Sequence, residues 1–235
     1  MAASLSATPL PQALKDLAAR AGMPPSKAHR YLVSLIRAGL AEQDRESGHY
    51  RLGPLALQLG LAALASLDVM KLGGEAIAEL RLEIDETIMF AIWGNRGPVV
   101  VRWEESSRPV VTNVRVGWVM PLLNSATGRL FAAYLPRETT EALLAEELHR
   151  TPDEGERYAA RLEEIRKRGL SRVEGELLQG VAGMAAPVFD YRGAMVAAIT
   201  AVGRERAMDV SWNGPVAKAV KLAAQRLSQR LGFAG

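Results

Sequence analysis

The sequence predicts an α+β protein in which a small, helical N-terminal module precedes a larger domain built on an antiparallel sheet. Its 235 residues are enough for two domains with buried cores. The first 67 residues hold seven Lys or Arg and four Asp or Glu, so they carry the whole net charge of +3. The rest of the chain is electrically neutral and becomes strand-like from Thr87 onwards. These observations predict a basic module joined to a neutral, sheet-containing domain.

Two short helices joined by a glycine-containing turn are predicted at the start of the basic module. Residues 12–21 place apolar side chains on one face of a first helix, and the segment 22–24 interrupts the pattern. Pro24 and Pro25 suit the first turn of a second helix, because the N–H that proline lacks has no intrahelical partner there. The second helix has an apolar stripe opposite a basic face that begins at its N-terminus. This arrangement predicts a helix-turn-helix.

A β-hairpin is predicted directly after the second helix. Gly39 provides a C-terminal cap, and residues 40–43 and 49–52 are strand-like pieces on either side of the turn 44–48. A helix-turn-helix followed at once by a hairpin is a winged helix. The second helix would enter the major groove of DNA, and the wing would reach the flanking backbone. The expected DNA-binding residues are Ser26, Lys27, His29 and Arg30 on the helix and Arg45 and Arg51 on the wing.

A helix rich in leucine and alanine follows the wing. Residues 53–67 contain no charged side chain, so this helix must be covered by protein, either as a buried linker or as a dimer contact. We favour a linker that also packs. Asp68 is placed to cap a further helix that extends to about Glu83. The expected domains are a winged helix at 1–53, a linker helix at 54–68 and a second domain at 69–235.

The second domain alternates between strand-like and helical patterns. β-branched and aromatic runs are separated by Gly, Asn, Ser and Pro, which favour turns. Strands in an antiparallel meander with helices at the ends indicate an α+β sensory-type domain. The predicted elements are strands at 87–93, 99–105 and 110–114, a helix at 125–135, a helix opened by a capping box at 151–154 and continuing to 168, a hairpin of 181–190 and 195–203, and a helix at 212–231.

Composition narrows the class of protein. Hydrophobic residues make up 49% and charged residues 23%, which is typical of a globular chain. The chain has no cysteine, which excludes disulfides, iron–sulfur clusters and a thiol nucleophile. Its longest apolar stretch is interrupted by charged residues, and its N-terminus lacks the pattern of a secretory signal. We therefore expect a cytoplasmic protein without a membrane partner.

Two alternatives to DNA binding are disfavoured by the sequence. An enzyme would need a catalytic motif, and the nucleophile elbow, phosphate-binding loop, dinucleotide fingerprint and zinc-protease motifs are all missing. No two of the three histidines have ligand spacing, so neither a metal nor a cofactor is expected. The adjacent acidic pairs at 146–147 and 163–164 are interpreted as solvated helix faces. RNA recognition would need exposed aromatic side chains, but only Tyr31 and Tyr50 are available in the basic module, and Tyr31 is expected to be packed.

Four segments in the right order resemble the IclR family of bacterial transcription regulators: residues 14–44, 49–60, 121–136 and 169–203. The resemblance implies a winged-helix domain, a linker helix and a GAF-like effector domain whose antiparallel sheet is flanked by helices. It implies a homo-oligomer, a dimer or a dimer of dimers, that binds double-stranded operator DNA and controls a catabolic operon. Binding of a metabolite by the C-terminal domain would change the affinity for DNA or polymerase, in a direction that the sequence does not reveal.

The chain departs from this family at two places. Family members usually have a full helix before residue 14, whereas here the first residues resemble only the tail of that helix. A shortened helix would weaken DNA binding, which keeps open the alternative of a sensory or interaction module with impaired DNA binding. Leu123 and Asn124 stand where relatives commonly carry His-Ala. This change alters the effector pocket, so the ligand of a relative cannot be copied.

The resemblance places the effector between the sheet and the start of the helix at Ser125. The free N–H groups of a helix N-terminus favour an anion, so we expect a small organic or aromatic carboxylate, with Thr200 as a donor. Glu174 and Glu176, in the loop that covers the pocket in relatives, would contact a hydroxyl or a cation.

Apolar side chains on the strands would form the rest of the effector pocket. Met89, Trp103 and Trp118 are candidates for its walls, although such residues on strands are more often simply part of the core. The expected effector-binding residues are Met89, Trp103, Asn124, Ser125, Ala126, Thr127, Gly128, Gly183, Met184, Thr200 and Val202.

Overall fold

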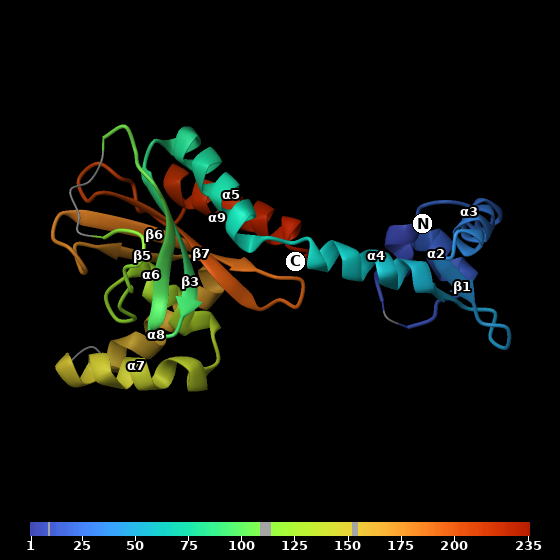
Figure 1. Ribbon diagram of the computed structural model, residues 1–235, viewed down its shortest axis with the longest axis horizontal. Helices are drawn as coiled ribbons and strands as arrows, with labels where there is room; N and C mark the ends of the chain where they lie inside the picture. The colour runs from blue at the N-terminus through green and yellow to red at the C-terminus, as the bar shows by residue number, and fades with distance from the viewer. Residues whose placement is uncertain (9, 109–113, 152–154) are drawn as a thin grey trace. The chain divides into compact units, whose positions relative to one another are not determined.

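The computed structural model of the chain describes residues 1–8, 10–108, 114–151 and 155–235 (Figure 1). These residues form two compact units, Met1–Leu67 and Asp68–Gly235, and each is described by itself. The predicted fold class is confirmed, with a winged helix-turn-helix and its following helix in the first unit and an antiparallel sheet flanked by helices in the second. The predicted strand at 110–114 and the capping box at 151–154 fall largely outside the described residues.

The first unit is a winged helix-turn-helix module with an apolar core. Gly22, at a positive φ of 63°, turns the chain between its second and third helices. Pro24 is the N-cap of the third helix and Pro25 its first residue, as the sequence predicts. The core consists of Leu5, Leu17, Leu32, Ala41 and Tyr50. The elements are α1 (Ala2–Ser6), α2 (Leu14–Arg20), α3 (Pro25–Arg37), β1 (Ala41–Gln43), β2 (Tyr50–Leu52) and α4 (Pro54–Ala65).

Helix α4 is not buried within the first unit. Its start is fixed to the winged module, because the backbone N–H of Leu55 donates to the Gly39 carbonyl at 3.0 Å. None of its residues, all of which the structure describes, is buried. Leu57 and Leu61 are 66% and 57% exposed. The first unit therefore does not provide the packing expected for this helix, and its apolar surface is left exposed there.

The second unit is a five-stranded antiparallel sheet in the order β4-β3-β7-β6-β5. Figure 1 shows α5 and α9 on one face of this sheet and α6 and α8 on the other. The elements are α5 (Val69–Ile84), β3 (Thr87–Gly94), β4 (Gly97–Glu104), α6 (Ala126–Tyr134), α7 (Arg137–Arg150), α8 (Gly155–Arg168), β5 (Ser171–Glu174), β6 (Val181–Phe189), β7 (Met195–Arg204) and α9 (Pro215–Arg230).

Small residues let the helices approach the sheet closely. A Cβ on Gly73 of α5 would lie 2.5 Å from the Phe90 ring of β3, so glycine is required where these elements cross. Along β3, Phe90 faces α5 whereas Ala91 belongs to the core beneath α6. This alternation separates the two layers of the unit. Asp68 caps α5 as expected, since its carboxylate accepts hydrogen bonds from the N–H groups of Met70 and Lys71.

Within the described residues, no single helix has both the length and the hydropathy of a membrane span, although α4 and α5 taken together reach those values.

Candidate DNA-binding face and ligand cavity

Helix α3 presents a basic face to solvent. Ala28 and Leu32 are fully buried against the module's core, which fixes the rotation of the helix about its axis. Lys27 and Arg30 lie on the opposite face and are exposed, and Ser26 is exposed in the first turn. These three predicted residues therefore share the surface through which a winged helix contacts the major groove.

Tyr31 extends this face. The sequence interpretation treats it as packed, but the structure leaves 49% of the residue exposed. It lies one helical turn after Lys27, so its ring borders the basic surface rather than the core. An exposed aromatic ring at this position is suited to contact thymine methyl groups or the sugar–phosphate backbone.

The wing is held by a compact turn. Asp44 Oδ1 accepts hydrogen bonds from the backbone N–H and the hydroxyl of Ser47, both at 2.7 Å, and these bonds lower the pKa of the Asp44 carboxyl. The Asp44 carboxylate therefore stays ionised, and keeps both acceptor contacts, at lower pH than an unpaired aspartate. Arg45 is exposed in this turn. The remaining wing residue, Arg51, forms an ion pair with Glu42 across the hairpin.

His29 lies at the junction of helix and wing. Its Nδ1 is 3.4 Å from the Tyr50 hydroxyl, so the imidazole is directed towards β2 rather than to the basic centre of α3. The structure therefore brings Ser26, Lys27 and Arg30 together, keeps Arg45 at the wing tip, and leaves His29 and Arg51 with partners inside the module.

A cavity lies between α6 and the sheet of the second unit. The space open to the centre of a water molecule is about 40 Å³, enough for a few waters. The described residues around it include no charged side chain. They are Met89, Trp103, Val114, Met120, Ser125, Ala126, Thr127, Val173, Leu177, Leu178, Val181, Ala182, Gly183, Thr200 and Val202.

The polar part of the cavity wall is the start of α6. Ser125 is the N-cap of this helix, and its Oγ accepts a hydrogen bond from the Gly128 N–H and donates one to the Pro121 carbonyl. The N–H groups of Ala126 and Thr127 belong to the first turn, so they have no acceptor inside the helix. Thr127 Oγ1 is 2.8 Å from Thr200 Oγ1. Because two hydroxyls share one hydrogen bond, the pair retains a second O–H for a ligand.

Eight of the eleven expected effector-binding residues line this cavity. Met184 does not, because neighbouring residues on a strand point to opposite faces and Gly183 is the one that faces α6. Asn124 also lies outside the wall, and its buried Oδ1 has no hydrogen-bond partner among the described residues. Trp118, also considered as a wall, is 39% exposed and lies elsewhere on the surface.

Gly128 lies outside the wall for a steric reason. A Cβ there would be 2.0 Å from the Pro121 carbonyl oxygen and 2.8 Å from Leu122 Cα, so this residue lets α6 pack against the backbone. We expect Gly128→Ala to lower the free energy of unfolding of the second unit by about 3 kcal/mol, since the backbone would have to move. Urea unfolding monitored by tryptophan fluorescence would measure this loss.

Gly74→Ala is the matched control for that variant. Gly74 lies inside α5, and a Cβ there would meet its nearest atom, Arg102 Nε, at 3.9 Å. This substitution should stabilise the unit by about 0.5–1 kcal/mol, because alanine is the better helix former. If Gly128→Ala and Gly74→Ala changed the free energy of unfolding equally, the close approach of α6 to the Pro121–Leu122 backbone would not contribute to stability.

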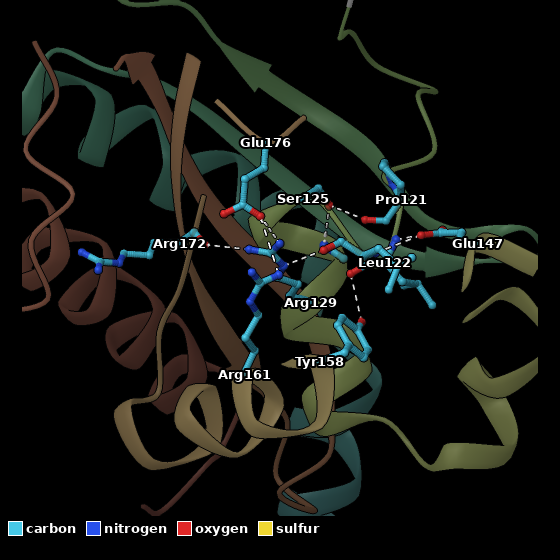
Figure 2. A network of polar contacts seen from close by, with 11 residues as sticks. Pro121, Leu122, Ser125, Arg129, Glu147, Tyr158, Arg161, Arg172 and Glu176 are labelled. Carbon is cyan, nitrogen blue, oxygen red and sulfur yellow. Dashed lines mark hydrogen bonds and ion pairs between the residues drawn. The ribbon is translucent and has the colours of Figure 1, made fainter. Parts of the chain in front are cut away.

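A buried arginine on α6, Arg129, is the centre of a polar network (Figure 2). The Arg129 side chain is 5% exposed, and its guanidinium donates to the Leu123 carbonyl at 2.6 Å and to the Arg172 carbonyl at 3.3 Å. It also forms an ion pair with Glu176. The sequence suggests that Glu174 and Glu176 contact a ligand, but the structure pairs Glu176 with Arg129 and Glu174 with Arg172.

Glu147 has a structural role that sequence reasoning missed. Its carboxylate accepts hydrogen bonds from the N–H groups of Leu122 and Leu123, both at 2.9 Å, as Figure 2 shows. It is therefore not part of a merely solvated face, in contrast to the prediction for this acidic pair. Tyr158 donates to the Leu122 carbonyl at 3.0 Å, and burial raises the pKa of its hydroxyl. These contacts fix the segment that leads into α6.

Within the described residues, no group of three or more His, Cys, Asp or Glu side chains could hold a metal ion.

A winged helix with a basic exposed helix, followed by an antiparallel domain with an apolar cavity, defines the class of DNA-binding transcriptional regulators. The family model of the IclR helix-turn-helix domain matches residues 3–45, and that of the bacterial transcriptional regulator IclR C-terminal region matches residues 61–229. The chain belongs to the IclR family of bacterial transcriptional regulators.

Relatives and solved structures agree with this assignment. The crystal structure of Pseudomonas aeruginosa HmgR superposes with a TM-score of 0.90 at 43% identity, covering 99% of this chain and 95% of that one. The glycerol operon regulatory protein of Streptomyces coelicolor is 31% identical over 81% of this chain and 76% of its own length. The transcriptional regulator KipR of Bacillus subtilis is 27% identical over 94% of this chain and 90% of its own.

Proposed function

We propose that the protein is a ligand-responsive regulator of a catabolic operon, and that its effector is a small organic acid with an apolar or aromatic body. The observation that carries this proposal is the cavity at the start of α6, whose wall combines helix N–H groups with a Thr127–Thr200 hydroxyl pair. An anion is stabilised at such a helix terminus. One of the curated relatives is a glycerol operon regulatory protein, which is consistent with catabolic control.

The chemistry of the wall favours a ligand with no more than one ionised group. No charged side chain from the described residues lines the cavity, so a second ionised group on the ligand would be buried without a counterion. Met89, Trp103 and Met120 provide apolar and aromatic surface in the same wall, with Met89 directly across the sheet from Thr200. A monocarboxylate with a ring or a short chain would satisfy both the polar and the apolar parts of this wall.

The proposed mechanism couples this cavity to DNA affinity. Ser26, Lys27, Arg30 and Arg45 would contact DNA, and α4 would pair with a second copy of the chain and connect the two units. A ligand can shift the oligomer between binding-competent and incompetent states only if it binds them with different affinities. Such a regulator would act in the cytoplasm, where operator DNA is found.

The ligand proposal is tested with benzoate and its uncharged analogue benzamide. Isothermal titration calorimetry should show benzoate binding at least about tenfold tighter than benzamide, because only the carboxylate gains charge-assisted hydrogen bonds. Thr200→Val should weaken benzoate binding about tenfold by removing a hydroxyl donor. Benzoate should also change the anisotropy of a complex with DNA from upstream of the protein's own gene.

Thr140→Val provides the control for the threonine variant. Thr140 is also buried, but it lies on α7 outside the cavity, so its replacement should leave benzoate affinity unchanged. An equal loss of benzoate affinity in Thr200→Val and Thr140→Val would show that the binding site is not this cavity. Equal binding of benzoate and benzamide would refute a carboxylate effector.

A further inference from the structure

The loop between β5 and β6 has two sides with different chemistry. Leu177 and Leu178 line the ligand cavity, and Leu177 also packs against the buried cluster that contains Met89 and Val202. Glu176, directly before them, is instead paired with Arg129 of α6 and lies 4.0 Å from Arg161 of α8. Figure 2 shows Glu176 reaching the two guanidinium groups from the loop.

Glycines bound this loop at both ends. Gly175 has a φ of 74° and Gly180 a φ of 78°, conformations that other residues rarely adopt. Two hydrogen bonds close the loop: the Gly175 N–H donates to the Val181 carbonyl at 2.9 Å, and the Val181 N–H donates to the Leu178 carbonyl at 3.0 Å. The four residues between the glycines therefore form one compact segment bounded by two conformationally permissive positions.

The ion pair with Arg129 constrains the segment. Arg129 is 5% exposed, so its charge needs a counterion, whereas the Glu176 side chain is 38% exposed. Moving the segment outward would separate this pair and leave a buried cation. The Arg129 guanidinium also donates hydrogen bonds to the Leu123 and Arg172 carbonyls, which fix its position. Glu176 therefore pairs with a cation whose position does not depend on the loop.

The small size of the cavity connects the Glu176–Arg129 ion pair to the size of the ligand that can bind. Its space of about 40 Å³ must widen to admit an aromatic acid, and Leu177 and Leu178 belong to a part of the wall that lies outside the helices and strands. We propose that Glu176 is a positioning residue of the cavity, which holds Leu177 and Leu178 in the wall through Arg129 and so sets the size of the ligand admitted. This inference rests on the proposed function.

Hydrogen exchange of the free protein tests the inference without a ligand. Glu176→Gln should raise the exchange rates of the Gly175 and Val181 amides about tenfold, because the neutral amide holds Arg129 less strongly. Arg161→Gln should raise them about threefold, since it removes the more distant partner without leaving Arg129 unpaired. Amides of β7 should change less than twofold in both variants, which shows that the unit remains folded.

Glu163→Gln is the matched control, because Glu163 forms an exposed ion pair with Lys167 on α8 at 2.8 Å. It should leave loop exchange unchanged. Unchanged loop exchange in both Glu176→Gln and Arg161→Gln would overturn the inference, and so would an increase spread evenly over the whole unit.

Ligand size supplies a readout that a merely structural residue would not change. The affinity for 2-naphthoate relative to benzoate should rise at least tenfold in Glu176→Gln and stay constant in Glu163→Gln. An unchanged ratio with faster loop exchange would show that the loop does not set ligand size, and would overturn the inference. Failure of both acids to bind any variant would contradict the proposed function, while the exchange result would still decide whether Glu176 holds the loop.

Discussion

Replacing Arg30 by alanine is expected to weaken DNA binding about a thousandfold. Arg30 is exposed at the centre of the basic face of α3, opposite the buried Leu32. Loss of one arginine contact costs about 2 kcal/mol, and a dimer would lose it twice, which gives about 4 kcal/mol in total. Fluorescence anisotropy on DNA from upstream of the protein's own gene would measure the change.

Arg137→Ala is the matched control for the Arg30 variant. Arg137 lies on α7 in the second unit and is also highly exposed, so its removal changes net charge by the same amount. Its DNA affinity should stay within about threefold of the unmodified protein. If the two variants lost affinity equally, net charge rather than a specific contact at α3 would explain the binding.

Replacing Leu57 and Leu61 of α4 together by glutamate is expected to dissociate the proposed oligomer. Both are exposed, and they lie four residues apart on one helix face. Burial of one leucine contributes about 2 kcal/mol, so four leucines across a dimer contribute roughly 8 kcal/mol, more than four orders of magnitude in the dissociation constant. Sedimentation velocity at micromolar concentration should show a monomer.

Leu82→Glu serves as the comparison, because Leu82 is a still more exposed leucine on α5 of the second unit. It should leave the sedimentation coefficient unchanged. Glutamate is a good helix former, so neither variant should lose helix content in circular dichroism. A Leu57/Leu61 variant that sediments like the unmodified protein would show that α4 is not the contact between copies.

The winged helix could be predicted because its signals are local. Paired prolines start α3, Gly39 ends it, and the apolar stripe fixes which face is buried. The charge split at residue 67 coincides with the boundary between the two compact units. What the pattern did not reveal was the pairing of exposed side chains, such as Arg51 with Glu42, which depends on the register of the wing.

The ligand cavity was predictable only in part, since its wall depends on contacts distant in sequence. Residues at the start of α6 follow from the resemblance and from the chemistry of a helix N-terminus. Met184 was expected in the wall but lies outside it, because it follows Gly183 on β6 and neighbouring residues on a strand point to opposite faces of the sheet. Val173 could have been found from alternation along β5, whereas Leu177 belongs to a loop that has no periodicity. Glu147 contacts a segment 25 residues away, which no local pattern encodes.

The most direct test of the account is the salt dependence of DNA binding. Lys27, Arg30 and Arg45 have exposed side chains, and Arg51 is partly neutralised by Glu42, so a dimer offers six to eight phosphate contacts. We predict a log–log slope between about −5 and −7 on DNA from upstream of the protein's own gene, with a clear preference over scrambled DNA. A slope shallower than about −2 without sequence preference would contradict the account and favour a sensory module with impaired DNA binding.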